Sequence, residues 1–243
     1  TNLKRIEINK EDLIILAIDS KIGNWRKILD SEYKSNRAEI RKKTGLDWNS
    51  IYADSAALVE NFKISTPFHV VEIDMLESDD IVAAGCRYFK DDEVIIISTD
   101  SDFEMLTYYP NVKLFSPKTK KYKVVKGNSS GGFRAIQKES CSILSKKIKK
   151  EKTDNLIKPI TSLEDYQTRD TIVNLLRLPE DIENKVIKEL DKLGNKEYDV
   201  NKFRFPKLIG EIEKIYNNEG KKVVTYSDSF KKKRTRQKSE SLF

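Results

Sequence analysis

The chain has 243 residues, of which 38% are hydrophobic and 35% are charged, and its formal net charge is +7. This length suits one large domain or two small ones with a buried core, and no apolar run approaches the roughly 18 residues of a membrane span. The two cysteines, Cys86 and Cys141, lie in unrelated segments, which argues against a disulfide scaffold or a thiolate zinc site and favours a reducing compartment. The single histidine, His69, argues against histidine-based metal sites, and we interpret it as structural.

Three short apolar runs in the first half of the chain predict buried strands: LIILAID (13–19), FHVVEID (68–74) and EVIIIST (93–99). Helical patterns lie at 55–63 and 78–89, and Ser78 or Asp79 is placed to cap the second helix. Strands that alternate with helices predict an α/β fold with a mainly parallel central sheet and flanking helices. Charges interrupt the apolar stretch of residues 1–16, which is unlike a signal peptide, so we expect a cytoplasmic protein.

The segment 112–125 predicts a strand, a turn at Pro117–Lys120 and a second strand. Glycine and serine at 126–132 then predict a turn or linker. Beyond this linker the pattern becomes helical and rich in lysine. Helices are predicted in three segments: 133–150, 179–193 and 205–220.

Acidic residues follow all three predicted strands. Asp19 closes the first strand, and two groups follow the second and the third: Glu77, Asp79 and Asp80, then Asp100 and Asp102. Because sites in open α/β sheets form beyond the carboxyl ends of the strands, we expect these carboxylates to meet at one edge of the sheet. Such oxygen ligands favour Mg²⁺ or Mn²⁺, and two ions of this kind can activate water toward a phosphodiester. A single acid here is more often a helix cap, but capping does not explain three strand ends together.

Basic residues gather in four segments of the sequence: 21–43, 113–126, 146–152 and 231–238. The acidic groups lie between these segments. Basic residues around an acidic centre suit a site that binds several phosphates and holds a divalent metal ion next to one of them. Taken alone, the segment 21–43 also fits a solvated helix of mixed charge.

Four stretches together have a recognisable pattern: AIDSKIGNWRK (17–27), EYKSNR (32–37), ESDDIVA (77–83), and ISTDSDFEML (97–106) followed by YPNVKLFSPKTKKY (109–122). With these stretches the chain resembles the 5′-nuclease (flap endonuclease) family with its PIN-like catalytic domain. Within that family it resembles most the ribonuclease H branch of the T-even bacteriophages, which are 5′-to-3′ exonucleases and flap nucleases. The third stretch matches the family motif Glu-Ala-Asp-Asp-Ile, and the resemblance covers roughly residues 11–160.

The resemblance implies a two-metal site for Mg²⁺, with Mn²⁺ able to substitute. Its ligands would be Asp19, Glu77, Asp79, Asp80, Asp100, Asp102, Glu151 and Asp154, with Glu151 standing where the family has an aspartate. The catalytic residues would be Asp19, Lys34 and Arg37. The residues that contact nucleic acid would be Arg26, Lys27, Tyr33, Lys34, Arg37, Arg41, Lys120 and Lys121, most of them in a basic arch over 21–43 that grips a single-stranded 5′ end.

The resemblance also implies three parts: a PIN-like catalytic domain over 1–126, a helical nucleic-acid-binding part over 127–229 and a basic flexible tail over 230–243. The family's first strand, which carries its own metal-binding aspartate, has no match in this sequence. The family's glycine-containing helix-hairpin-helix, often built around K⁺, is shortened and lacks glycine at 158–170.

The expected activity is metal-dependent 5′-to-3′ hydrolysis at the ends of DNA or RNA–DNA hybrid, as in primer removal during phage-type replication. Two alternatives remain open: a branched-DNA-binding accessory protein with impaired catalysis, and a PIN-type RNA endonuclease. Leu242 and Phe243 resemble the end of a sliding-clamp-binding peptide, although a basic tail that only adds affinity for DNA is the simpler interpretation. A single-stranded-DNA-binding protein is a further expected partner, and a membrane is not.

Overall fold

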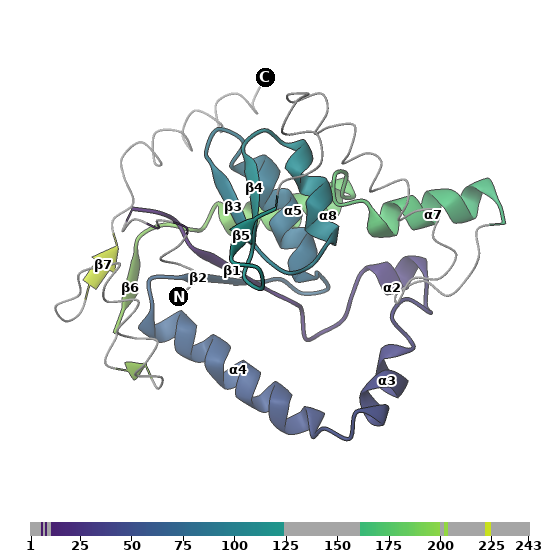
Figure 1. Ribbon diagram of the computed structural model, residues 1–243, viewed down its shortest axis with the longest axis horizontal. Helices are drawn as coiled ribbons and strands as arrows, with labels where there is room; N and C mark the ends of the chain where they lie inside the picture. The colour runs from purple at the N-terminus through teal and green to yellow at the C-terminus, as the bar shows by residue number, and fades with distance from the viewer. Residues whose placement is uncertain are drawn as a thin grey trace. The chain divides into compact units, whose positions relative to one another are not determined.

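The computed structural model describes Ile6, Ile8 and residues 11–123, 161–199, 202–203 and 222–224 (Figure 1). Several predictions lie outside these residues: the linker at 126–132, the helices at 133–150 and 205–220, the ligands Glu151 and Asp154, and the tail with Leu242 and Phe243. The predicted boundary between residues 126 and 127 lies outside them too. These predictions stay predictions.

The chain forms two compact units, each assembled from segments that are distant in the sequence. The first unit comprises residues 1–16, 48–71 and 192–243, and the second comprises 17–47 and 72–191. The chain changes units at four places, and two of these lie within strands β1 (Ile15–Ile18) and β2 (His69–Glu72), which form a two-stranded sheet. Both strands lie inside predicted apolar runs, which confirms these two predictions.

The second unit holds most of the helices and strands described. They are α2 (Arg26–Leu29), α3 (Arg37–Lys43), α5 (Ser78–Tyr88), β3 (Val94–Ile97), the 3₁₀ helix η1 (Asp102–Tyr108), β4 (Val112–Ser116), β5 (Lys121–Tyr122), α7 (Leu163–Val173) and α8 (Glu180–Leu190). Strands β3 and β4 pair in parallel, and β4 pairs with β5 in the antiparallel sense around the predicted turn at 117–120. The predicted α/β fold is therefore confirmed, but among the described residues the strands form three small sheets.

Helices α5 and α8 pack against each other in the second unit, as Figure 1 shows. Helix α8 buries Ile182, Val186 and Leu190, which lie four residues apart and form one apolar stripe. Arg87 on α5 reinforces this contact, since its Nε donates a 2.5 Å hydrogen bond to Glu183 Oε1. The sequence predicted α8 correctly because its apolar residues recur at helical spacing.

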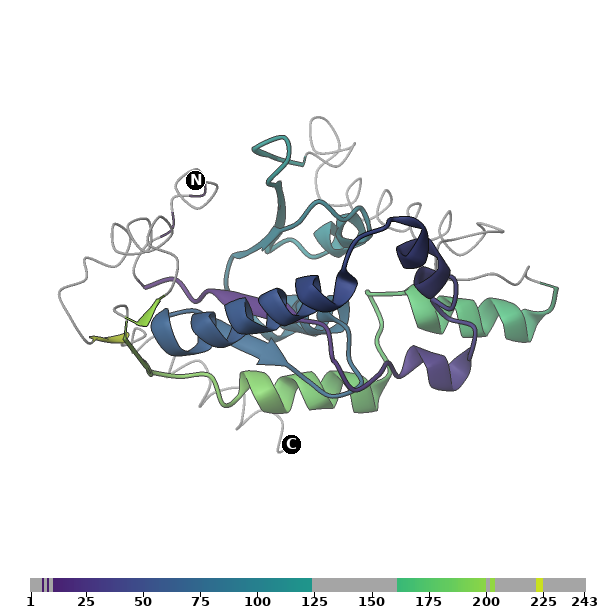
Figure 2. The same cartoon turned by 90° about the horizontal axis from the view of Figure 1, so that it is seen from below.

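Helix α2 lies beside α7 in both views of the second unit (Figures 1 and 2). At this contact Arg26 Nε donates a 2.8 Å hydrogen bond to the carbonyl oxygen of Ile172. The basic segment after β1 is thus attached to a helix more than a hundred residues later. In the described parts of the chain, no helix is both long and apolar enough to cross a bilayer.

The first unit contains α4 (Trp48–Ser65), β6 (Lys196–Tyr198) and β7 (Lys222–Val224). Phe62 on α4 lies 5.9 Å from Phe68 and 5.6 Å from Phe203, measured between ring centroids. His69 is buried in this unit, and Lys196 Nζ donates a hydrogen bond to the neighbouring carbonyl of Phe68. The histidine therefore lies beside packed aromatic rings, next to a half-buried lysine.

We expect the burial of His69 to make the stability of the folded protein depend on pH. Burial, and after it the positive charge of Lys196, lowers the pKa of His69 to about 4. Between roughly pH 6.5 and 4 the unfolded chain binds a proton that the folded chain does not, so stability falls as the pH falls through this range. At pH 5 the contribution of His69 alone should be a loss of about 1–2 kcal/mol relative to pH 7.

The measurement is direct because the chain has a single histidine. Its ring resonances in a proton NMR titration should give a pKa near 4, and in a Lys196→Met variant the pKa should rise. Urea unfolding at pH 7 and pH 5, compared with the same measurement on a His69→Gln variant, gives the accompanying change in stability, because the contributions of other titrating groups then cancel. A histidine that titrates at its ordinary value in the folded protein would contradict this account.

Candidate metal centre

The start of α5 presents four consecutive polar residues, Glu77 to Asp80. Glu77 precedes the helix in an extended conformation, and its backbone N–H donates a 3.0 Å hydrogen bond to Asp80 Oδ2. The prediction that Ser78 or Asp79 caps this helix is therefore wrong. Asp80, in the third helical position, reaches back to the residue before the helix, and this leaves the side chains of Ser78 and Asp79 available for other contacts.

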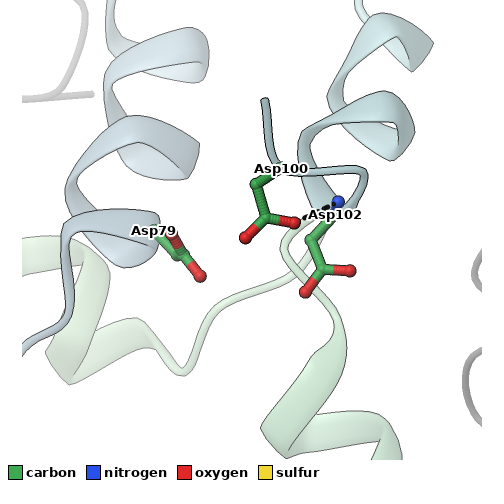
Figure 3. A group of neighbouring side chains, drawn as sticks. All are labelled: Asp79, Asp100 and Asp102. Atoms are coloured by element: carbon green, nitrogen blue, oxygen red, sulfur yellow. Dashed lines mark hydrogen bonds between the residues drawn. The ribbon is translucent and has the colours of Figure 1, made fainter. Parts of the chain in front are cut away.

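Three aspartates come together at one place in the second unit (Figure 3). One carboxylate oxygen from each of Asp79, Asp100 and Asp102 lies within 4.8 Å of the other two. Asp79 comes from the first turn of α5, Asp100 follows β3, and Asp102 begins η1. Asp102 donates its backbone N–H to Asp100 Oδ1 at 2.9 Å, which fixes the loop that carries both residues. We call these three residues the aspartate cluster.

The electrostatics of the aspartate cluster favour a bound cation. Burial, followed by the charges of Glu77 and Asp100, raises the pKa of Asp79 to about 6. Both causes penalise the charged carboxylate, and a divalent ion would offset them. The available donors are carboxylate oxygens, the ligands that Mg²⁺, Mn²⁺ and Ca²⁺ prefer. The cluster therefore fits a hard divalent metal ion.

Asp19 lies beside the start of α5 but is not one of the three clustered residues. Its Oδ1 accepts two hydrogen bonds from Ser78, at 2.8 Å from the backbone N–H and at 2.6 Å from the hydroxyl. The next residue, Ser20, also bonds to the loop before α5, since its N–H donates to the carbonyl of Leu76 at 2.9 Å. The structure thus brings the end of β1 to the start of α5, and the prediction that Asp19 binds metal stays a prediction.

The chain beyond Asp19 crosses closely over the loop before α5. Gly23 has a φ of +146°, and a Cβ there would lie 2.9 Å from the sulfur of Met75. Only glycine permits this close approach with this backbone conformation. Two residues later, the Trp25 N–H donates to the carbonyl of Met75 at 2.8 Å. This crossing delivers Trp25 and Arg26 to the buried face of α5.

Asp80 is bound by side chains of the predicted arch. Its side chain is fully buried, and Arg26 donates to both of its oxygens at 2.9 and 2.7 Å in a bidentate pair. Trp25 Nε1 adds a third bond to Asp80 Oδ2 at 3.0 Å. Such a pair is stronger than a neutral hydrogen bond and fixes the relative orientation of the two groups. Asp80 therefore contacts the chain's own cation in this structure, rather than the aspartate cluster.

Glu77 is bound in a similar way. Tyr33 Oη donates to its Oε2 at 2.9 Å, Lys34 Nζ forms an ion pair with its Oε1, and Arg26 Nη1 lies 3.2 Å from Oε2. Burial alone would raise the pKa of Glu77, but Lys34 and Arg26 hold it below its ordinary value. Lys34 adopts a left-handed backbone, with φ of 58°, which is unfavourable outside glycine. The ion pair with Glu77 offsets part of that cost.

The predicted nucleic-acid contacts separate into buried and surface residues. Arg26 and Tyr33 are only 2% and 5% exposed. The others lie at or near the surface: Lys27, Arg37, Lys120 and Lys121 are exposed, and Lys34 and Arg41 are half-buried. No structural observation tests the roles predicted for these residues, and they stay predictions.

From the sequence, no role in the site was assigned to two residues that the structure places there. Trp25 bonds to Asp80, and Ser78 bonds to Asp19. Their partners are 55 and 59 residues away in the sequence. The one sequence feature that could have pointed to a contact of Ser78 at the site is its place within an acidic motif. Trp25 gave no comparable signal, because a tryptophan beside an arginine fits many surfaces.

Comparison with known proteins shows the family to which the chain belongs. Residues 1–132 match the family described as "5′-3′ exonuclease, N-terminal resolvase-like domain". Ribonuclease H of Enterobacteria phage T4 is 28% identical in a 240-residue alignment that covers 95% of this chain and 74% of that protein. The T5 D15 protein co-crystallised with metal ions has a similar fold, with a TM-score of 0.55 at 16% identity, over 77% of this chain and 85% of that one. The predicted resemblance is confirmed, and the chain belongs to the 5′-3′ exonuclease family.

Proposed function

We propose that this protein is a divalent-metal-dependent 5′-to-3′ nuclease that hydrolyses phosphodiesters at 5′ ends and flaps of DNA or RNA–DNA hybrid. The observation that supports this most is the meeting of Asp79, Asp100 and Asp102 in a member of the 5′-3′ exonuclease family. Mg²⁺ is the proposed ion and Mn²⁺ the proposed substitute, because the donors are hard oxygens. Two ions are proposed, with Glu151 and Asp154 completing the second position.

Different residues of the chain would have different roles in catalysis. The aspartate cluster and Asp19 would hold the ions. When bound, such ions lower the pKa of water and offset the charge that develops on the phosphodiester. Lys34 and Arg37 would hold the scissile phosphate by charge-assisted hydrogen bonds and so fix its orientation. Glu77 supports this assignment for Lys34, since it already holds the ammonium group near the start of α5.

The remaining parts of the proposal concern biological context. The similarity to the phage T4 ribonuclease H supports a role in removing replication primers, in the cytoplasm of an infected bacterial host. A sliding clamp that binds Leu242 and Phe243, and a single-stranded-DNA-binding protein, are the proposed protein partners.

One observation favours a second candidate, a branched-DNA-binding protein with impaired catalysis. Glu77 and Asp80, both predicted ligands, are bound here by Arg26 and Lys34 of the chain itself. If that arrangement persists with metal present, fewer carboxylates remain for two ions. Such a protein would keep its basic surface and bind DNA without cutting it.

Cleavage of a 5′-labelled flap duplex tests the proposal. We expect short 5′-labelled products in Mg²⁺ or Mn²⁺ and none in EDTA. A plain single-stranded RNA of the same sequence serves as the comparison substrate and should be cut far more slowly. Tight binding of an intact flap in both metals would support the second candidate, and preferential cutting of the RNA would support a PIN-type RNA endonuclease.

A further inference from the structure

Ser78 makes a contact that the proposed mechanism has not used. Both of its donors, the backbone N–H at 2.8 Å and the hydroxyl at 2.6 Å, bond to the same oxygen of Asp19. Within the described residues, the other oxygen of Asp19 accepts no hydrogen bond. The contact therefore holds one carboxylate oxygen and leaves the second available.

The position of Ser78 explains why this contact is strong. Ser78 is the first residue of α5, and its N–H is one of the groups at a helix start that lack a partner within the helix. The carboxylate of Asp19 satisfies that N–H and lies where the helix dipole favours a negative charge. The hydroxyl adds a short charge-assisted bond. Two donors on one oxygen restrict the rotation of the carboxylate more than one donor would.

The contact also links Asp19 to the aspartate cluster along the chain. Ser78 directly precedes Asp79, whose carboxylate meets those of Asp100 and Asp102. The backbone at this junction has its own support, because the N–H of Ser20 donates to Leu76 at 2.9 Å and the N–H of Met75 donates to Ser20 Oγ at 3.0 Å. Loss of the Ser78 hydroxyl should therefore loosen the Asp19 side chain without separating β1 from α5.

We propose that Ser78 is a positioning residue, which orients Asp19 so that its second oxygen can bind a divalent ion. The proposal rests on the proposed function, since it assumes that the site holds such an ion. An alanine at this position would supply the backbone N–H alone. The hydroxyl bond to Asp19 therefore depends on the serine side chain.

Binding of Mn²⁺ without DNA, followed by electron paramagnetic resonance of the free ion, tests the proposal independently of cleavage. We expect Ser78→Ala to weaken Mn²⁺ binding about tenfold, at the low end of the effect of losing a group that orients a ligand. Ser78→Thr keeps the hydroxyl and should bind as the unaltered chain does. In cleavage assays, Ser78→Ala should need more Mg²⁺ for half-maximal rate and regain most of its rate at saturating Mg²⁺.

The same substitution in an Asp19→Asn chain completes the test. There Ser78→Ala should cause no further loss of Mn²⁺ affinity, because its partner is already altered. Unchanged Mn²⁺ affinity in Ser78→Ala, an equal loss in the Asp19→Asn background, or no Mn²⁺ binding by the unaltered chain would each overturn the proposal. A chain that binds Mn²⁺ with the expected pattern but cuts no flap would refute the proposed function and leave the role of Ser78 supported.

Discussion

Replacing Asp100 with asparagine is expected to slow metal-dependent cleavage at least about 100-fold, because even groups that only orient metal ligands cost 10- to 100-fold. The substitution removes one of the three charges of the aspartate cluster. The fold should persist, since the amide oxygen of asparagine can still accept the hydrogen bond from the Asp102 N–H. The charge of Asp100 also contributes to the raised pKa of Asp79, so its removal should leave the metal-free protein as stable as before or more stable.

This combination of lost activity with preserved stability distinguishes a functional carboxylate from a structural one. The measurements are initial rates of flap cleavage, Mn²⁺ binding and urea unfolding of the metal-free chain. Asp181→Asn is the matched control, because it makes the same chemical change at an exposed position of α8 in the same unit. If Asp100→Asn keeps its cleavage rate within about threefold of the unaltered chain, the aspartate cluster is not the catalytic centre.

The elements that frame the site were predictable from the sequence. Strands β1, β2 and β3 are short apolar runs, and α5 and α8 carry apolar residues at helical spacing. These signals depend on residues close together in the chain, so one sequence is enough to read them. The meeting of Asp79 with Asp100 and Asp102 was predictable too, because it follows from the rule about strand ends.

The sequence did not predict which carboxylates meet in the aspartate cluster and which pair with basic side chains of the chain itself. Asp79 and Asp80 are identical neighbours, but adjacent residues point roughly 100° apart around a helix. One belongs to the aspartate cluster, and the other is buried against Arg26. Which of the two side chains faces the protein interior depends on Arg26, which lies 54 residues from Asp80 in the sequence. For the same reason the pattern could not separate the buried Arg26 from the exposed Lys27 beside it.

The second large effect is expected from Arg26→Ala, which should destabilise the second unit by about 3–5 kcal/mol. Arg26 is 2% exposed and donates to both oxygens of Asp80 and to the carbonyl of Ile172. Its removal leaves the fully buried Asp80 without a cation, and an uncompensated buried charge is costly. Arg26→Lys should be intermediate, because lysine keeps the charge but cannot reproduce the bidentate pair.

The two tryptophans allow the second unit to be observed by itself, since Trp25 lies in that unit and Trp48 in the other. In a Trp48→Phe background, urea unfolding followed by Trp25 fluorescence should show the full loss for Arg26→Ala. Arg177→Ala, at an exposed position of the same unit, should change the stability by less than about 0.5 kcal/mol.

The double variant Arg26→Ala/Asp80→Ala should lose less stability than the sum of the losses in the two single variants, because neither charge is then left unpaired. An Arg26→Ala chain with unchanged stability and weakened DNA binding would instead assign Arg26 to the substrate, as the family resemblance implies.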